Sequence, residues 1–334
     1  MSSSSKYSRR RFLGVTAGAG AAGMAAALLA LNRDAGAPAE VAASAANSAA
    51  APDALRVIHA PAELEVAEVA PPLPPAVRPR GREDVVLMAG TEWEAAGTIH
   101  HSGRLGPRVM VLGGVHGNEP GGWLGAEAVA NWEVSRGSLI VLPRLNWRAA
   151  AAFERTLDGF GDLNRLYPGH TEGLPMARMA AEVTALAAFW RPAWLWDMHE
   201  SWAFYSERGE NGGTAFIGQT VTTADPAART VVEGLVRRVN GEVSEREAFL
   251  MRSRPGGVFS GSGSPNRTPP TAEEIALRTL PDGTRGSSSL SMGRFVPGVS
   301  PVLVEMGQMD QPESRRSELH QLLMRELLTE LRML

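Results

Sequence analysis

VMVLGGVHGNEP, at residues 109–120, joins a short apolar run to two glycines and a His-x-x-Glu motif. An apolar run of four residues that ends at glycine is typical of a buried strand. Pro120 favours the first turn of a helix, so His116 and Glu119 are expected where a strand turns into a helix. Their spacing lets both side chains converge on one ion, and the flanking glycines let the backbone bend close to it. The alternative is a hydrogen-bonded histidine and a carboxylate that stabilises the start of the helix.

A second motif, Asp197-Met198-His199, follows the apolar residues 193–196. Together with His116 and Glu119, His199 gives two imidazoles and one carboxylate, a set typical of a catalytic zinc with an open position for water. Asp197 lies two residues before His199, so on a strand the two side chains share one face, where the carboxylate can orient the imidazole. The alternative is a solvated pair at the end of a strand.

Glu305 directly follows a third apolar run, at residues 302–304. A carboxylate at the end of a buried strand is unusual unless it is paired or functional. Beside zinc it could accept a proton from water and pass it to a leaving group. Glu200 is a rival base or ligand, but it is expected on the opposite face of its strand from His199.

The order of apolar runs predicts an α/β fold. Order is expected to begin near residues 84–88. Strands are expected at residues 109–112, 139–142, 193–196, 214–217 and 302–304, and helices at 120–132, 176–190, 226–239 and 313–334. Strands that alternate with helices indicate a single domain with a mainly parallel mixed sheet and helices on both faces. Ligand sites in such sheets lie beyond the carboxyl ends of the strands, which is where all three motifs fall.

Asn164 and Arg165 lie in a loop bounded by Gly161 and Gly169. A guanidinium offers a bidentate fork for a carboxylate, so this pair is a candidate for binding a substrate carboxylate. Arg155 lies upstream and could reach the same cleft. For either arginine alone, a salt bridge at the surface is the plainer interpretation.

The first 45 residues predict export. Arg9-Arg10-Arg11-Phe12-Leu13 is typical of a twin-arginine signal, and a Gly/Ala-rich apolar run at residues 15–31 follows it. Small-residue sites suited to signal peptidase come next, so we expect cleavage, a periplasmic or extracellular protein, the twin-arginine machinery as a partner and no stable membrane span. The alternative is an uncleaved signal that anchors the protein in the membrane. The chain has no cysteine, which excludes a disulfide.

Three segments are therefore expected: the signal at residues 1–45, an Ala/Pro-rich linker or arm at 46–82, and a catalytic domain at 83–334. Within the domain, residues 252–297 are dense in Gly, Ser, Pro and Thr and form a long loop, a possible lid. Loss of the signal removes five basic and two acidic residues, which changes the net charge from −3 to −6. An acidic chain without a basic stripe argues against nucleic acid as a partner.

Together these motifs resemble the succinylglutamate desuccinylase/aspartoacylase family, a branch of the zinc carboxypeptidase fold. The resemblance extends from Met88 to Gly307. It rests on four pieces: Gly-Gly-Val-His116-Gly-Asn-Glu119-Pro, Gly-Asp-Leu-Asn164-Arg165, Asp197-Met-His199 and Val-Glu305-Met-Gly.

The resemblance implies one Zn²⁺ per chain, held by His116, Glu119 and His199. It implies that Glu305 is the general base and acid, and that Arg155 polarises the scissile carbonyl. It also implies that a substrate carboxylate binds Asn164 and Arg165, with Arg294, eleven residues before Glu305, as a looser match to a second substrate-binding arginine.

Two features differ from the better-known members of the family. Aspartoacylases carry a β-rich C-terminal domain, whereas the 29 residues after Glu305 look helical. Those enzymes are also cytosolic, whereas this chain has an export signal. Both differences make the chain look more like the carboxypeptidase and murein-peptide amidase branch.

The sequence thus predicts an exported zinc-dependent hydrolase that cleaves an amide bond in a small molecule or short peptide bearing a carboxylate. An N-acyl amino acid deacylase is the first interpretation. A carboxypeptidase or murein-peptide amidase acting on cell-wall peptides is the second. A zinc- or ligand-binding protein without turnover is the third, and the presence of Glu305 argues against it, because a binding protein needs no base there.

Overall fold

The computed structural model describes residues 78–252, 272–276, 278–283 and 285–334. The export signal, nearly all of the linker and residues 253–271 of the long loop lie outside the described residues. Among the helices that the structure describes, none combines the length and the apolar character that a membrane span requires.

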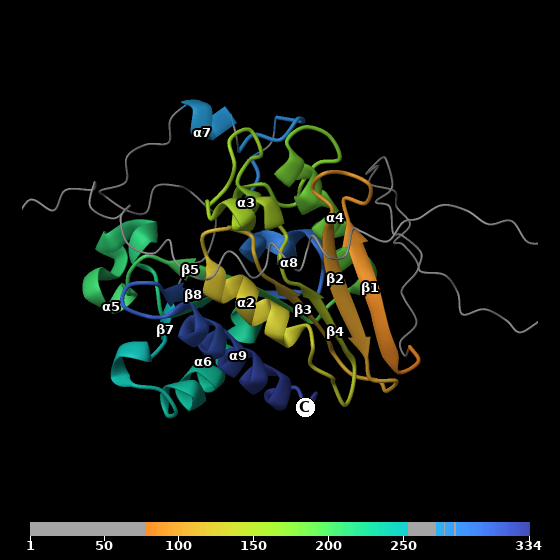
Figure 1. Ribbon diagram of the computed structural model, residues 1–334. Helices are drawn as coiled ribbons and strands as arrows, with labels where there is room; N and C mark the ends of the chain where they lie inside the picture. Colours follow the sequence, from red (N-terminus) through yellow and green to blue (C-terminus); the bar gives the residue numbers. More distant parts are fainter. Residues whose placement is uncertain (1–77, 253–271, 277, 284) are drawn as a thin grey trace, which may run out of the picture. The chain divides into compact units, whose positions relative to one another are not determined.

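An eight-stranded mixed sheet runs through the domain in the order β1-β2-β4-β3-β5-β8-β6-β7 (Figure 1). β4, β3, β5 and β8 are parallel, β1 and β2 extend one side in antiparallel pairs, and β6 is antiparallel to β8 on the other side. The strands are β1 Gly81–Leu87, β2 Ala95–His101, β3 Arg108–Leu112, β4 Ser138–Leu142, β5 Trp194–Ser201, β6 Thr220–Thr223, β7 Leu250–Arg252 and β8 Ser300–Gly307. The predicted α/β fold with a mainly parallel mixed sheet is confirmed.

Helices cover both faces of this sheet, because strand residues alternate between two hydrophobic cores. In β3, Met110 and Leu112 belong to one core, and Val109 and Val111 belong to the other. The first core packs against α4 and α8, and the second against α2, α6 and α9. The helices are α2 Pro120–Val129, α3 Trp147–Ala152, α4 Pro175–Trp190, α5 Tyr205–Arg208, α6 Pro226–Asn240, α7 Ala272–Ala276, α8 Met292–Phe295 and α9 Glu313–Glu330. The 3-10 segments are η2 Leu163–Arg165, η3 Gly209–Phe216, η4 Glu245–Glu247 and η5 Ser289–Ser291.

The expected strand at residues 214–217 is wrong. These residues lie in and just after the 3-10 segment η3, and the strand β6 begins later, at Thr220. The apolar run there is too short for its pattern to separate a strand from a turn. β6 is short and rich in threonine. It becomes a strand through its pairing with β8, and the local sequence pattern does not indicate this pairing.

A buried ion pair links the C-terminal helix α9 to the strand β5. Arg316 Nε lies 2.7 Å from Glu200 Oε1, and the two side chains are 7% and 0% exposed. Gln308 Nε2 donates to Glu200 Oε2 at 3.0 Å and to the Asn118 carbonyl at 2.8 Å. Burial raises the pKa of Glu200 to about 7, although Arg316 opposes the shift. The pair therefore joins α9 to β5, and Gln308 links it to the loop between His116 and Glu119.

We expect Arg316→Ala to destabilise the protein by about 3–5 kcal/mol, because it leaves the Glu200 carboxylate buried without its cation. Urea unfolding of the purified protein measures this. Arg238→Ala is the matched control, since Arg238 of α6 pairs with Glu326 of α9, the helix that also carries Arg316. The Arg238 side chain is 45% exposed, and a surface ion pair contributes about 0–1 kcal/mol to stability. Equal losses in the two variants would refute the role assigned to the buried pair.

Candidate metal centre

The loop between β3 and α2 brings His116 and Glu119 to the carboxyl end of the sheet. Gly114 has a positive φ of 62°, a conformation that glycine adopts without strain. Gly117 lies so close to α3 that an added Cβ would be 2.0 Å from the Ala149 carbonyl carbon. Glu119 is the residue at the N-cap of α2. The glycine-rich sequence is thus required for the loop to fold tightly against α3.

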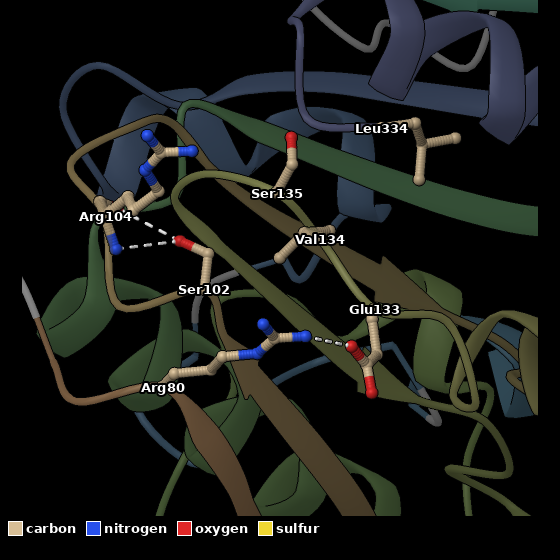
Figure 2. Close-up of a pocket in the computed structure, with 7 residues that line it drawn as sticks. All are labelled: Arg80, Ser102, Arg104, Glu133, Val134, Ser135 and Leu334. Atoms are coloured by element: carbon tan, nitrogen blue, oxygen red, sulfur yellow. Dashed lines mark hydrogen bonds and ion pairs between the residues drawn. The ribbon is translucent and has the colours of Figure 1, made fainter.

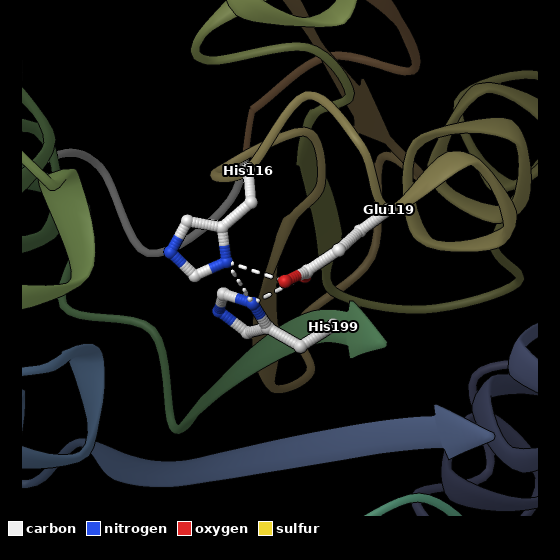
Figure 3. Close-up of side chains that lie close together, drawn as sticks. All are labelled: His116, Glu119 and His199. Atoms are coloured by element: carbon white, nitrogen blue, oxygen red, sulfur yellow. Dashed lines mark hydrogen bonds and ion pairs between the residues drawn. The ribbon is translucent and has the colours of Figure 1, made fainter. Parts of the chain in front are cut away.

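Three buried side chains converge at this point. His116 Nδ1 lies 2.7 Å from Glu119 Oε1, and His199 Nδ1 lies 2.8 Å from Glu119 Oε2. The two Nδ1 atoms are 3.1 Å apart. Figure 3 shows both imidazoles and the carboxylate pointing toward one another. The structure therefore brings together the three residues that the sequence predicted as metal ligands.

The outer nitrogen of each imidazole faces a carboxylate. His116 Nε2 lies 3.1 Å from Asp162 Oδ1, and His199 Nε2 lies 2.9 Å from Asp197 Oδ2. With Nε2–H donated to these carboxylates, each Nδ1 carries a lone pair directed into the cluster. Asp197 takes the position predicted for it. Asp162 belongs to the motif Gly161-Asp-Leu-Asn-Arg165, but the sequence did not indicate that it would contact His116.

This arrangement fits a metal ion of the zinc type. Two lone pairs and a carboxylate that face one another repel unless a cation lies among them. Ligand atoms that share one Zn²⁺ at about 2.0–2.2 Å lie within roughly 4 Å of one another. The nearest pairs of donor atoms here are 2.7–3.1 Å apart. His116, Glu119 and His199 form a group that could hold an ion.

The protonation states agree with a cation site. Burial lowers the pKa of His199, but Asp197 and Glu119 outweigh it and raise this pKa well above its usual value. Burial raises the pKa of Glu119, but His116 and His199 outweigh it and leave this pKa below the usual range. The Glu119 carboxylate is therefore charged, and a proton on the imidazole of His199 competes with a metal ion.

Glu305 lies beside His199 because β5 and β8 are paired in parallel with these two residues in register. Residues in register on neighbouring strands point to the same face and are about 4.8 Å apart at the backbone. Glu305 is 8% exposed. Burial raises its pKa to about 8, although His199 opposes the shift. The sequence placed His199 and Glu305 just after strands, whereas both lie within strands that remain paired up to Ser201 and Gly307.

Arg155 contacts the cluster from its exposed side. Its Nη1 donates to Glu119 Oε1 at 3.3 Å, its Nη2 donates to Asp162 Oδ2 at 3.1 Å, and the side chain is 44% exposed. Burial lowers the pKa of Arg155, but Asp162 and Glu119 raise it more, so the guanidinium is charged. A cation in this position can donate to an oxygen atom of a substrate.

Asn164 and Arg165 lie next to the cluster in η2. Asn164 is buried, its Oδ1 accepts from the backbone N–H of Ser289 at 3.0 Å, and its Nδ2 lies 3.3 Å from His199 Nε2. Arg165 Nη1 donates to the Asn164 carbonyl at 2.7 Å. The contact with Ser289 was missed by the sequence analysis, because Ser289 lies in the Gly/Ser-rich loop and carries no motif.

Arg294 is placed apart from these residues. It is exposed on α8, where the neighbouring Gly293 packs against Val299 and Pro301 at the amino end of β8. Glu305 lies near the other end of that strand, roughly 16 Å along it at about 3.3 Å per residue. No contact among the described residues joins Arg294 to the cluster.

A hollow of about 430 Å³ lies elsewhere in the fold, near the amino end of β4 (Figure 2). It is lined by Arg80, Ser102, Arg104, Glu133, Val134, Ser135 and Leu334. None of the predicted site residues contributes to it. The ion pair among its lining residues, Arg80 with Glu133, is exposed to solvent, unlike the buried cluster of His116, Glu119 and His199.

Residues 105–202 match the family model described as the succinylglutamate desuccinylase/aspartoacylase catalytic domain, which confirms the resemblance predicted from the motifs. The matched segment contains most of the candidate site: His116, Glu119, Arg155, Asn164, Arg165, Asp197 and His199. Glu305 and Arg294 lie outside it. No match was found among curated proteins.

Solved structures share the fold at low sequence identity. A succinylglutamate desuccinylase/aspartoacylase from Rhodobacter sphaeroides has a TM-score of 0.52 and 17% identity, covering 76% of this chain and 66% of its own. A variant of cell shape determinant protein Csd4 from Helicobacter pylori has a TM-score of 0.51 and 17% identity, covering 68% and 51%. The tripeptide-bound form of Csd4 has a TM-score of 0.50 and 16% identity, covering 68% and 51%. This chain thus spans about half the length of the Csd4 structures.

We expect the purified protein to bind one Zn²⁺ per chain, and His199→Ala to abolish binding, because two of the three donors cannot hold the ion alone. Metal content after dialysis, with competition against a chromophoric chelator, measures this. His170→Ala is the control, since His170 is a loop histidine whose imidazole Nδ1 accepts from the backbone N–H of Glu172 at 3.2 Å, and it is not among the three proposed ligands. Equal zinc in the His199→Ala variant and in the parent would refute the assignment of the three ligands.

Proposed function

We propose that this chain is an exported zinc-dependent hydrolase that cleaves an amide bond, with an N-acyl amino acid as the first candidate substrate. The observation that carries the proposal is the convergence of His116, Glu119 and His199, with Glu305 in register beside His199. The family-model match over residues 105–202 supports the reaction class.

Zn²⁺ held by His116, Glu119 and His199 would supply Lewis acidity, which polarises a carbonyl and makes water a better nucleophile at neutral pH. Proton transfer and stabilisation of the oxyanion would be carried out by side chains of the protein. Glu305 is buried next to His199, so its carboxylate can take the proton of the attacking water and deliver it to the leaving nitrogen. Arg155 can donate to the oxyanion of the substrate, because its guanidinium is charged and exposed at the cluster.

A substrate carboxylate would bind Asn164 and Arg165. The Asn164 amide is held by the backbone N–H of Ser289 and lies beside His199, and the Arg165 guanidinium donates to the Asn164 backbone carbonyl. A fixed amide and a guanidinium next to the reacting centre position a carboxylate near the scissile bond. This is why we propose an acylated amino acid or a peptide end as the substrate class.

A cell-wall peptide is the second candidate substrate. Two observations favour it: the twin-arginine motif at residues 9–13 and the similarity in fold to Csd4, one of whose structures contains a tripeptide. A panel of N-acyl amino acids, C-terminal dipeptides and muropeptides separates the candidates. Faster hydrolysis of muropeptides would replace the deacylase proposal by the amidase proposal, and hydrolysis of neither class would favour a binding protein.

The export part of the proposal rests on the sequence of residues 1–45. The twin-arginine machinery would be the partner, and the mature protein would act in the periplasm or outside the cell. Retention by an uncleaved signal is the alternative. Fractionation of cells distinguishes soluble periplasmic from membrane-bound protein, and recovery from the cytoplasm alone would contradict export.

We expect Glu305→Gln to lower kcat by about 10²–10⁴-fold, because glutamine cannot take the proton from water. Zinc content should stay at the parent value, since Glu305 is not among the three proposed ligands. Steady-state kinetics on the best substrate of the panel and metal analysis of the same sample provide the two measurements. Near-normal turnover in the variant would exclude Glu305 as the base.

We expect Arg165→Ala to lower kcat/KM by more than tenfold (roughly 1.4 kcal/mol) for amides that carry a carboxylate, and much less for uncharged amides or esters. Arg294→Ala is the matched control, because Arg294 is exposed at the far end of β8 and should leave both classes nearly unchanged. The proposed carboxylate site fails if Arg165→Ala reduces both classes equally.

A further inference from the structure

Ser289 contacts two residues of the site at once. It is 1% exposed and is the first residue of η5. Its hydroxyl donates to Asp197 Oδ2 at 2.5 Å, and its backbone N–H donates to Asn164 Oδ1 at 3.0 Å. Asp197 Oδ2 in turn accepts from His199 Nε2 at 2.9 Å. One carboxylate oxygen is therefore held between the hydroxyl of Ser289 and the imidazole of His199.

We propose that the Ser289 hydroxyl is a positioning group for the metal centre, which acts through Asp197 on His199. The inference rests on the proposed metal site. Ser289 itself touches neither the cluster of donor atoms nor, by this proposal, the substrate. It fixes the carboxylate that fixes the orientation of one ligand.

Asp197 depends on the Ser289 hydroxyl because its carboxylate has few hydrogen-bond partners. It is fully buried, and its other oxygen, Oδ1, has no hydrogen-bond partner among the described residues. A buried carboxylate needs donors to hold its charge and its orientation. If the hydroxyl of Ser289 is removed, His199 is the one hydrogen-bond donor left to the Asp197 carboxylate among the described residues. The imidazole would then have no independently held carboxylate to orient it.

The neighbouring serines do not share this position. Ser287 Oγ donates to Ser291 Oγ at 2.5 Å and lies 3.3 Å from the Tyr167 carbonyl, and Ser291 Oγ donates to the Ser288 carbonyl. These bonds hold the segment itself together. Ser288 is 4% exposed, and its hydroxyl has no partner within the part of the chain that the structure describes. Ser288→Ala thus provides a matched control, since it removes a buried hydroxyl from the same turn without touching Asp197.

Ser289→Ala removes the hydroxyl and keeps the backbone N–H that Asn164 requires. We expect it to weaken Zn²⁺ binding by about 10–100-fold, which is the usual effect of losing a group that orients a ligand. Ser288→Ala should leave Zn²⁺ binding within about twofold of the parent. Affinity is measured on the metal-free full-length protein by competition with a chromophoric chelator. Urea unfolding of the metal-free proteins shows whether each variant is folded.

A double-mutant cycle separates positioning from a loss of packing. In an Asp197→Ala background, Ser289→Ala should change Zn²⁺ affinity by less than about threefold, because the acceptor through which Ser289 acts is gone. A full additional loss in that background would overturn the proposal, and so would equal losses for Ser288→Ala and Ser289→Ala. If the parent binds Zn²⁺ and Ser289→Ala binds it equally well, only this inference fails. If the parent binds no Zn²⁺, the proposed function fails with it.

Discussion

The parallel pairing of β5 with β8 is the interaction on which the candidate site depends. It puts His199 next to Glu305, so a proposed ligand and the proposed base come from two strands whose relative position is fixed by backbone hydrogen bonds. A shift of one residue would turn Glu305 to the opposite face of the sheet. The pairing extends through the last residues of both strands, so both side chains stand on rigid backbone.

Glu119 contacts β5 at two consecutive residues, through the side chain of His199 and the backbone of Glu200. One of its oxygens, Oε2, lies 2.8 Å from His199 Nδ1 and also accepts from the Glu200 backbone N–H at 3.0 Å. The Glu200 side chain points to the other face, where Arg316 and Gln308 hold it. The sequence expectation that Glu200 faces away from His199 agrees with these contacts. The carboxylate of Glu119 is thus supported by the same strand that supplies its neighbouring ligand.

Short-range sequence patterns were enough to predict the central strands and the candidate metal ligands. The apolar runs before Gly113 and Asp197 gave the central strands, and the spacing of His116, Glu119 and His199 gave a cluster that the structure places together. What it missed depends on contacts between distant segments. β2 contains a glycine and two histidines, and it becomes a strand through its two antiparallel neighbours. Ser289 gains its position only when the segment that carries it folds against Asp197, and no pattern in its own neighbourhood indicates this.

The ion pair between Glu200 and Arg316 has a consequence for the order of events during synthesis. A ribosome makes the ligand-bearing loop at residues 116–119 long before it makes Glu305 or the helix that carries Arg316. Contacts between residues this far apart in the sequence form late, because a long segment must first be ordered. The buried pair therefore forms only after α9 has been made, and until then Glu200 lacks the cation that neutralises it.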